Sequence, residues 1–122
     1  MRVLVVDDND DIRLLVRTVL VMQDFEVDEA RDGVEALAIL RQADPPSAVL
    51  LDINIPAPDG MEVLATIRSE GLAVKVAIFS AHTDPQIERA TLEAGADAFL
   101  VKPFTPTTLG ETVERLVGPA SP

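Results

Sequence analysis

Three carboxylates stand directly after two short apolar runs of the sequence. Asp7 and Asp8 follow residues 2–6, and Asp52 follows residues 48–51. Two unit charges about 4 Å apart repel by about 4 kcal/mol at an effective dielectric constant of about 20. If the three groups converge, either a carboxylate takes up a proton or a cation binds between them. An all-oxygen site with few carboxylates and room for water suits Mg²⁺.

A hydroxyl and an ammonium group follow two further apolar runs. Ser80 comes after residues 74–79, and Lys102 comes after residues 98–101. A lysine ammonium is compact enough to contact a phosphoryl group beside a metal ion. Metal and ammonium together can hold the equatorial oxygens of that group while a carboxylate attacks in line. Asp52 is therefore a candidate nucleophile, and an acyl phosphate is its product.

The apolar runs have the composition of buried strands. Continuous apolar character over about four to six residues, rich in β-branched side chains, is typical of strands buried on both faces. Residues 2–6, 48–51, 74–79 and 98–101 fit this description. Residues 25–28 alternate between apolar and acidic types, which predicts an edge strand with one wetter face.

Helical patterns occupy the segments that follow each strand. Apolar side chains recur there at the i, i+3, i+4 spacing of a helix face. The predicted faces are Ile12, Leu15, Val16, Val19 and Leu20; Val34, Leu37, Ala38 and the stem of Arg41; Met61, Leu64 and Ala65; Ile87, Ala90, Thr91 and Ala94; and Leu109, Val113, Leu116 and Val117.

The helix ends carry their own signals. Residues 84–85 (Asp-Pro) and 105–106 (Thr-Pro) each indicate an N-cap followed by proline in the first turn. Asp10 or Asp11 is available to cap the first helix. Glycine stands where three helices should end, at Gly71, Gly95 and Gly118.

The repeated strand–helix order predicts the fold class. Five strands alternating with five helices favour an α/β fold with a doubly wound parallel sheet and helices on both faces. Ligands of such sheets bind at the carboxyl ends of the strands, which is where the acids, Ser80 and Lys102 stand. We expect one domain over residues 1–117, with residues 118–122 as a tail or the start of a linker.

Composition excludes several functions. The 122 residues carry 21 Asp and Glu against 10 Lys and Arg, a net charge of −11 at pH 7. That charge repels nucleic acid phosphates and anionic membranes, so we expect no binding to either. The chain has no cysteine for a disulfide or thiolate site. It shows no signal peptide and no apolar run near the roughly 20 residues of a membrane span, so the cytoplasm is the expected location.

Four motifs together resemble the receiver (response-regulator) domains of two-component signalling. They are VVDDN at 5–9, LDINIPAPDG at 51–60, FSA at 79–81 and GADAFLVKPF at 95–104. The resemblance covers residues 2 to 117 in order. It implies the flavodoxin or CheY-like architecture, in which five parallel strands have the order 2-1-3-4-5.

The resemblance also implies roles for single residues. Asp52 matches the phosphoacceptor, Asp8 a direct metal ligand, and Asp7 the carboxylate that holds metal-bound water. Asn54 matches the residue whose backbone carbonyl joins the metal, Mg²⁺ in this family, with Mn²⁺ as the other divalent cation of such sites. Ser80 and Phe99 match the switch pair, and Lys102 the ammonium that contacts the phosphoryl group, followed by Pro103 as a candidate cis peptide.

Partners follow from the same resemblance. The phosphoryl donor is a sensor histidine kinase or a phosphotransfer protein, and the target is a downstream effector or a covalently linked output domain. The expected response is a change in the surface of the fourth helix, fifth strand and fifth helix, in a monomer or a phosphorylation-dependent dimer. Ala98 stands where many DNA-binding members carry an acid, which weakens the case for their salt-bridged dimer.

Two alternative functions remain beside this switch. A phosphatase of the haloacid-dehalogenase type also uses a strand-end Asp and Mg²⁺, but it needs a second acid where this chain has Asn54. A degenerate receiver that acts by constitutive interaction would have lost the acids or the lysine. In the favoured interpretation the protein is a switch and not an enzyme. Asn54 and His82 are hypothesised to set the lifetime of the phosphoaspartate of this switch.

Overall fold

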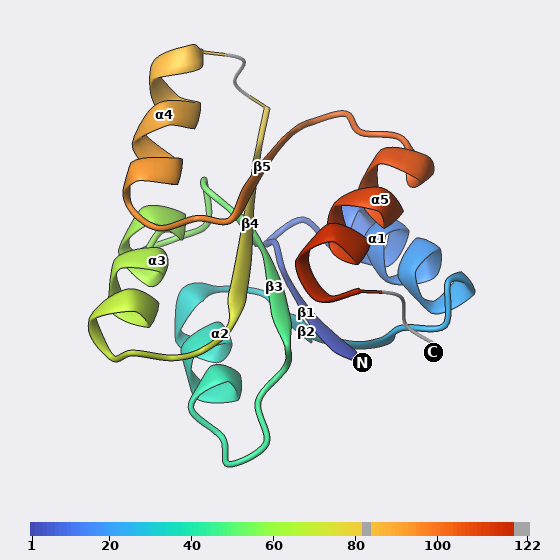
Figure 1. Ribbon diagram of the computed structural model, residues 1–122, viewed down its shortest axis with the longest axis horizontal. Helices are drawn as coiled ribbons and strands as arrows, with labels where there is room; N and C mark the ends of the chain where they lie inside the picture. Colours follow the sequence, from blue (N-terminus) through green and yellow to red (C-terminus); the bar gives the residue numbers. More distant parts are fainter. Residues whose placement is uncertain (82–83, 119–122) are drawn as a thin grey trace.

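The computed structural model describes residues 1–81 and 84–118 and contains one parallel sheet (Figure 1). Its strand order is β2-β1-β3-β4-β5, as the family resemblance implied. The strands are β1 (Arg2–Val6), β2 (Glu26–Ala30), β3 (Ala48–Asp52), β4 (Lys75–Ser80) and β5 (Ala98–Val101). The α/β fold predicted from the alternating pattern is therefore confirmed.

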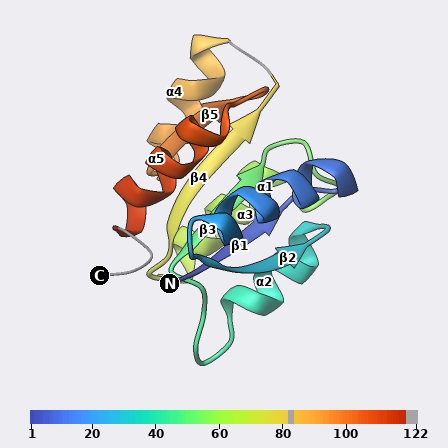
Figure 2. The same ribbon diagram turned by 90° about the vertical axis from the view of Figure 1, so that its right-hand side faces the viewer.

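A helix follows each strand, and the helices cover both faces of the sheet (Figures 1 and 2). They are α1 (Asp10–Met22), α2 (Gly33–Leu40), α3 (Gly60–Ser69), α4 (Pro85–Glu93) and α5 (Pro106–Val117). Buried residues of α2 and α3 form one core cluster with the sheet, and those of α1 and α5 form a second cluster on the opposite face. Two cores on a central sheet explain the nearly uninterrupted apolar strands.

The edge strand lies where its alternating pattern placed it, but it begins and ends later than predicted. β2 pairs only with β1 and runs over Glu26–Ala30 rather than 25–28. Phe25 belongs to the turn after α1, since its backbone N–H donates to the Leu20 carbonyl and its side chain is buried in the second core. Its apolar character therefore serves the core rather than the strand.

The core faces of α1 and α5 were predicted nearly correctly. Val16 and Leu20 of α1 are buried, as are Leu109 and Val113 of α5. Leu15 is the exception, because its side chain is 48% exposed at a depression between α1 and the loop after β5. Periodicity places Leu15 on the inner side of the helix, but it cannot show that this neighbouring loop leaves a gap.

The predicted face of α2 was mostly wrong, since Leu37 is the one predicted member that is buried. The helix buries Gly33, Ala36, Leu37 and Leu40, while Val34, Ala38 and Arg41 are exposed. Apolar residues surround this short helix on nearly every side, so several three-to-four-residue patterns fit the same letters. Packing against β1 and α3 decides which of them points inward.

The predicted face of α3 was partly wrong. α3 buries Val63, Leu64 and Ile67, whereas Met61 is half-buried and Ala65 is exposed.

α4 is the least embedded helix. Thr91 is its one buried residue, Ile87 is half-buried, and Ala90 and Leu92 are exposed. Ala94, which follows the helix, is half-buried. α4 therefore has little apolar anchorage to the sheet.

Helix starts and stops mostly follow their signals. Asp84 and Thr105 cap α4 and α5 ahead of first-turn prolines, as predicted. Gly71 and Gly95 follow the ends of α3 and α4 with positive φ, and Gly118 caps α5, also with positive φ. The expected cap of α1 was wrong, because Asn9 rather than Asp10 or Asp11 accepts the first-turn N–H groups.

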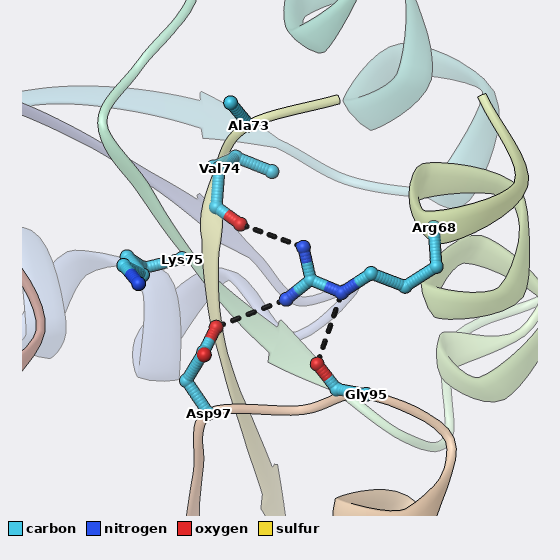
Figure 3. Close-up of a pocket in the computed structure, with 6 residues that line it drawn as sticks. All are labelled: Arg68, Ala73, Val74, Lys75, Gly95 and Asp97. Carbon is cyan, nitrogen blue, oxygen red and sulfur yellow. Dashed lines mark hydrogen bonds and ion pairs between the residues drawn. The ribbon is translucent and has the colours of Figure 1, made fainter. Parts of the chain in front are cut away.

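Arg68 joins three elements at the amino end of β4 (Figure 3). Its guanidinium donates to the carbonyls of Val74 and Gly95, both at 3.0 Å, and to the Asp97 carboxylate at 2.9 Å. Asp97 also accepts the Val76 N–H at 2.8 Å. All three guanidinium nitrogens thus bond within the protein, and Arg68 holds α3, β4 and the loop before β5 together at the edge away from the acids.

Within residues 1–81 and 84–118, no helix has both the length and the apolar character that crossing a bilayer requires.

Candidate functional site

Three carboxylates meet at the carboxyl edge of the sheet. Oxygen atoms of Asp7, Asp8 and Asp52 all lie within 4.8 Å of one another. β1 and β3 are parallel neighbours with Val6 opposite Leu51, so the residues that follow these two come side by side. Asp7 and Asp52 are buried and Asp8 is exposed, so the cluster opens to solvent on one side.

Lys102 supplies a positive charge inside this cluster. Its Nζ lies 2.9 Å from the Asp7 carboxylate and 3.2 Å from the Asp52 carboxylate. The two acidic side chains are only 1% and 7% exposed, and the lysine side chain is 19% exposed. At these distances, in a partly desolvated site, the ammonium offsets much of the repulsion between the two buried carboxylates.

The lysine ammonium lies over an aromatic ring. Lys102 Nζ lies 4.8 Å from the centroid of the buried Phe79 ring, which packs edge-on against Phe104. A cation over an aromatic face adds attraction where water is scarce. The Lys102–Pro103 peptide is cis, as expected, and the Ala57–Pro58 peptide, which the sequence did not single out, is cis as well.

The loop after β3 fixes Asp52. One oxygen of its carboxylate accepts the Asn54 N–H at 3.1 Å, and the other faces Lys102. Gly60 begins α3 directly against this loop, where a Cβ would come within 2.5 Å of the Asp52 carbonyl oxygen. The absence of a side chain at Gly60 therefore lets α3 start close to the candidate nucleophile.

Asp7 is held through several of its polar atoms. Its N–H donates to the Ala30 carbonyl at 3.2 Å, and its carboxylate accepts the Asn9 N–H at 2.9 Å. Arg13 of α1 donates from Nη1 to the Asp7 carbonyl oxygen at 2.9 Å. Neither the Asn9 cap nor this arginine was identified as part of the site from the sequence.

The arginine belongs to an ionic cluster beside the site. A hydrogen bond from Arg13 at 2.6 Å, followed by the charges of Arg13 and Arg31, lowers the pKa of the exposed Asp10. Burial acts to lower the pKa of Arg13, but its hydrogen bonds to and attraction for Asp10 and Glu29 outweigh this and raise it. The i, i+3 spacing of Asp10 and Arg13 could have suggested their pairing, but not the contact with Asp7.

Ser80 and Phe99 share one side of the sheet. β4 and β5 pair with Ile78 opposite Phe99 and Ser80 opposite Val101. Side chains alternate along a strand, so Ser80 points to the same face as Ile78, the face on which Phe99 packs. Ser80 is buried and Phe99 is half-buried, diagonal neighbours in the register.

Two predicted residues stand apart from this geometry. Asn54 is exposed on the loop after Asp52, where its backbone N–H contacts the carboxylate. His82 lies outside the described residues.

An apolar depression of about 290 Å³ borders the site beside Lys102. Its lining includes Ile12 and Leu15 of α1 and Phe104 of the loop after β5. Leu15 is half exposed there, so apolar surface faces solvent next to the carboxylate cluster.

The carboxylate cluster fits a divalent cation of the hard type. Its groups offer oxygen ligands only, and one side is open for water. Asp7, Asp8, Asp52 and the backbone carbonyl of Asn54 are the groups that the family resemblance implies around the metal. This donor set is typical of Mg²⁺ and unlike the sulfur and imidazole sets of zinc sites.

Comparisons with known proteins agree with the geometry. The family model described as response regulator receiver domain matches residues 3–114. The chain is 43% identical over 115 residues to the transcriptional regulatory protein PrrA of Mycobacterium leprae, covering 94% of this chain and 48% of that protein. It is 40% identical over 104 residues to the response regulator MprA of Mycobacterium avium, covering 85% of this chain and 45% of the relative. The chain thus spans about half the length of these curated relatives.

Solved structures give the same result. Vibrio cholerae chemotaxis protein CheY4 superimposes with a TM-score of 0.87 at 33% identity, covering 95% of this chain and 98% of that one. The receiver domain of Francisella response regulator 1452 gives 0.89 at 29% identity, covering 94% of each chain.

Proposed function

The chain belongs to the response regulator receiver domain family, and from that premise we propose that it is a phosphoryl-accepting switch with Asp52 as the acceptor. The observation that carries the proposal is the position of Lys102 between two buried carboxylates at the carboxyl edge of the sheet. An ammonium in that place is within reach of a negatively charged group that arrives at Asp52, which supports the proposal. We propose that the domain occupies residues 1–117 and that residues 118–122 are a tail or linker.

Mg²⁺ is the proposed cofactor, and Mn²⁺ is its proposed substitute. Asp8, Asp52 and the Asn54 carbonyl would bind it directly, with Asp7 holding a metal-bound water. When bound, the metal supplies charge neutralisation for the phosphoryl oxygens. The close approach of three carboxylates supports this assignment, because their mutual repulsion favours a cation.

The proposed transfer is a single displacement at phosphorus. The phosphorus–nitrogen bond of a phosphohistidine donor breaks, and its electron pair stays on the imidazole nitrogen. A bond forms between phosphorus and one Asp52 carboxylate oxygen. Lys102 is the residue that then contacts the phosphoryl oxygens, having been held at this edge by Asp7 and the Phe79 ring.

The proposed switch connects Asp52 to the surface of α4, β5 and α5. Ser80 would turn its hydroxyl toward the phosphoryl group, and Phe99 on the same side of the sheet would change rotamer. The sparse burial of α4, with Thr91 as its one buried residue, supports this direction of change. An element with few buried apolar contacts shifts at low cost in free energy.

The proposed partners are a sensor histidine kinase or a phosphotransfer protein and a downstream effector. The apolar depression at Leu15 supports a protein donor, because it places apolar surface beside the phosphorylation site. The chain spans about half the length of its curated relatives, which supports an output domain linked to the receiver. We further propose a cytoplasmic location, no direct nucleic acid or membrane contact, and a monomer or phosphorylation-dependent dimer.

Acetyl phosphate with Mg²⁺ tests the proposal directly. We expect the intact chain to gain the mass of one phosphoryl group and peptide mapping to place it on Asp52. Chelation of Mg²⁺ should prevent the gain. Turnover of phosphomonoesters without a stable adduct would instead favour a phosphatase of the haloacid-dehalogenase type. Asn54 argues against that enzyme, because an amide cannot serve as its general acid.

A phosphorylation-independent pseudo-receiver is the other alternative. The presence of Asp7, Asp8, Asp52 and Lys102 in one cluster speaks against it, since a site without function has no reason to keep these charges together. Failure of acetyl phosphate to modify the folded, Mg²⁺-binding chain would favour it.

The lifetime of the phosphoaspartate provides a separate prediction. Asn54 stands two residues after the acceptor, and His82 stands two residues after Ser80. Side chains at these two sequence positions are proposed to flank the water that attacks the phosphoaspartate. We expect Asn54→Ala and His82→Ala to change the autodephosphorylation rate by more than about twofold, that is by about 0.4 kcal/mol in the barrier. Loss of ³²P from the isolated phosphoprotein measures it. Rates within that margin for both variants would refute the hypothesis, and Gln86→Ala on exposed α4 is the control.

A further inference from the structure

Arg13 of α1 contacts the backbone of one member of the carboxylate cluster, Asp7. Its Nη1 donates to the Asp7 carbonyl oxygen at 2.9 Å, and its Nη2 donates to Asp10 at 2.6 Å. Nε approaches Glu29 of β2 at 3.4 Å. The side chain is only 12% exposed, so these contacts lie in a partly desolvated position.

The Asp7 carbonyl belongs to the peptide unit that joins Asp7 to Asp8. The carboxylate of Asp7 is already fixed by Lys102 and by the Asn9 N–H. The bond from Arg13 fixes the orientation of the peptide plane behind it. Asp8 begins at that plane, so the orientation of the plane influences the direction in which its exposed side chain leaves the backbone.

A cation near a metal site repels the metal ion, so the charge of Arg13 by itself would weaken metal binding. Here Asp10 and Glu29 both pair with the guanidinium, and Glu29 also pairs with Arg17 at 2.7 Å. The positive charge of Arg13 is therefore largely offset by its own partners. The contact with the Asp7 carbonyl is then the main route by which Arg13 can affect the site.

We propose that Arg13 is a positioning residue for the metal site, orienting the Asp7–Asp8 peptide so that both acids face a common divalent cation. The inference rests on the proposed function, since it concerns the same site. Groups that orient metal ligands from behind typically alter metal affinity by about 10-fold to 100-fold when removed.

Arg17 offers a matched control on the same helix. It carries the same charge and pairs with the same Glu29, and its hydrogen bond goes to that carboxylate rather than to the Asp7 backbone. Arg13→Met and Arg17→Met both keep an aliphatic stem and both remove one positive charge. A difference between them reports the contacts that Arg13 makes and Arg17 does not, with the Asp7 carbonyl and with Asp10.

Isothermal calorimetry with Mg²⁺ alone is the test, since the chain has neither Trp nor Tyr as a fluorescent probe. We expect the dissociation constant to rise about tenfold in Arg13→Met and to stay within about twofold of the unaltered chain in Arg17→Met. Arg13→Lys, which can keep one bond to the carbonyl, should recover most of the affinity. Urea denaturation without Mg²⁺ should show that both Met variants fold, with Arg13→Met the less stable because its side chain is 12% exposed and that of Arg17 is 53% exposed.

The outcomes separate the inference from the proposed function. If the unaltered chain binds no Mg²⁺, the proposed function and the inference both fail. If it binds Mg²⁺ and Arg13→Met binds equally well, the inference alone fails. Equal weakening in Arg13→Met and Arg17→Met also refutes it, because net charge would then be the cause. If Arg13→Met does not fold, Arg13→Gln, whose amide ends closer to α1, takes its place with the same expectation.

Discussion

Asp52→Asn should abolish phosphoryl transfer to the chain while leaving the fold intact. The amide has nearly the shape of the carboxylate but lacks its nucleophilic oxygen, so acetyl phosphate should add no phosphoryl group, a loss of at least about 1,000-fold in rate. Lys102 keeps its ion pair with Asp7 at 2.9 Å, so the lysine does not become an unpaired buried charge. Mass spectrometry of the intact variant measures the adduct.

Asp59→Asn is the matched control for this substitution. It removes the same charge from the same loop region, and asparagine caps a helix about as well as aspartate, so the bond to the Glu62 N–H that begins α3 is maintained. We expect normal phosphorylation of this variant. An adduct on Asp52→Asn, located at another carboxylate, would overturn the assignment of the acceptor.

The location of the candidate site was predictable because parallel strands impose it. Asp7, Asp52 and Ser80 each stand at the carboxyl end of an apolar run, and such ends meet at one edge whichever strands are neighbours. The contact between Lys102 and Asp52 was harder to predict. β4 lies between β3 and β5, so the lysine must cross the end of β4 over Phe79. The pattern placed Lys102 at the same edge as the acids, and the family resemblance added the strand order that this approach has to cross.

What escaped prediction is local competition among similar residues. Asn9, Asp10 and Asp11 are all able to cap α1, and the position of Asn9 at the end of the loop, with its N–H bonded to Asp7, decides which one does. On α2 the apolar residues outnumber the inward positions, and packing selects among them. Arg13 belongs to the site because its guanidinium reaches the Asp7 carbonyl, and a pattern of side-chain types cannot show a contact with the backbone.

Lys102→Met should act in opposite directions on stability and on metal binding. Without its ammonium, the buried Asp7 and Asp52 lose the cation that offsets their repulsion. We expect a loss of about 3 kcal/mol in the free energy of unfolding in the absence of Mg²⁺, the lower end of the range for breaking a buried pair, because the lysine is partly exposed. Urea denaturation followed by circular dichroism measures the loss.

The same variant should bind Mg²⁺ more tightly, because Lys102 competes with a metal ion for the oxygens of Asp52 and Asp7. Added Mg²⁺ should therefore stabilise Lys102→Met more than the unaltered chain, in proportion to the logarithm of metal concentration over dissociation constant. Phosphorylation by acetyl phosphate should nevertheless fall by about 100-fold even at saturating Mg²⁺, since a metal on one side of the phosphoryl group cannot replace a donor on the other.

Lys75→Met separates these effects from the mere loss of a lysine. Lys75 is the only other lysine of the chain, and it is exposed at the start of β4, at the opposite end of the sheet. We expect it to change neither Mg²⁺ affinity nor phosphorylation beyond about twofold. Tighter metal binding together with slower phosphorylation in Lys102→Met would show that the ammonium stands in for the metal before phosphorylation and works beside it during transfer. If both properties fell in parallel, Lys102 would instead be holding the fold of the site.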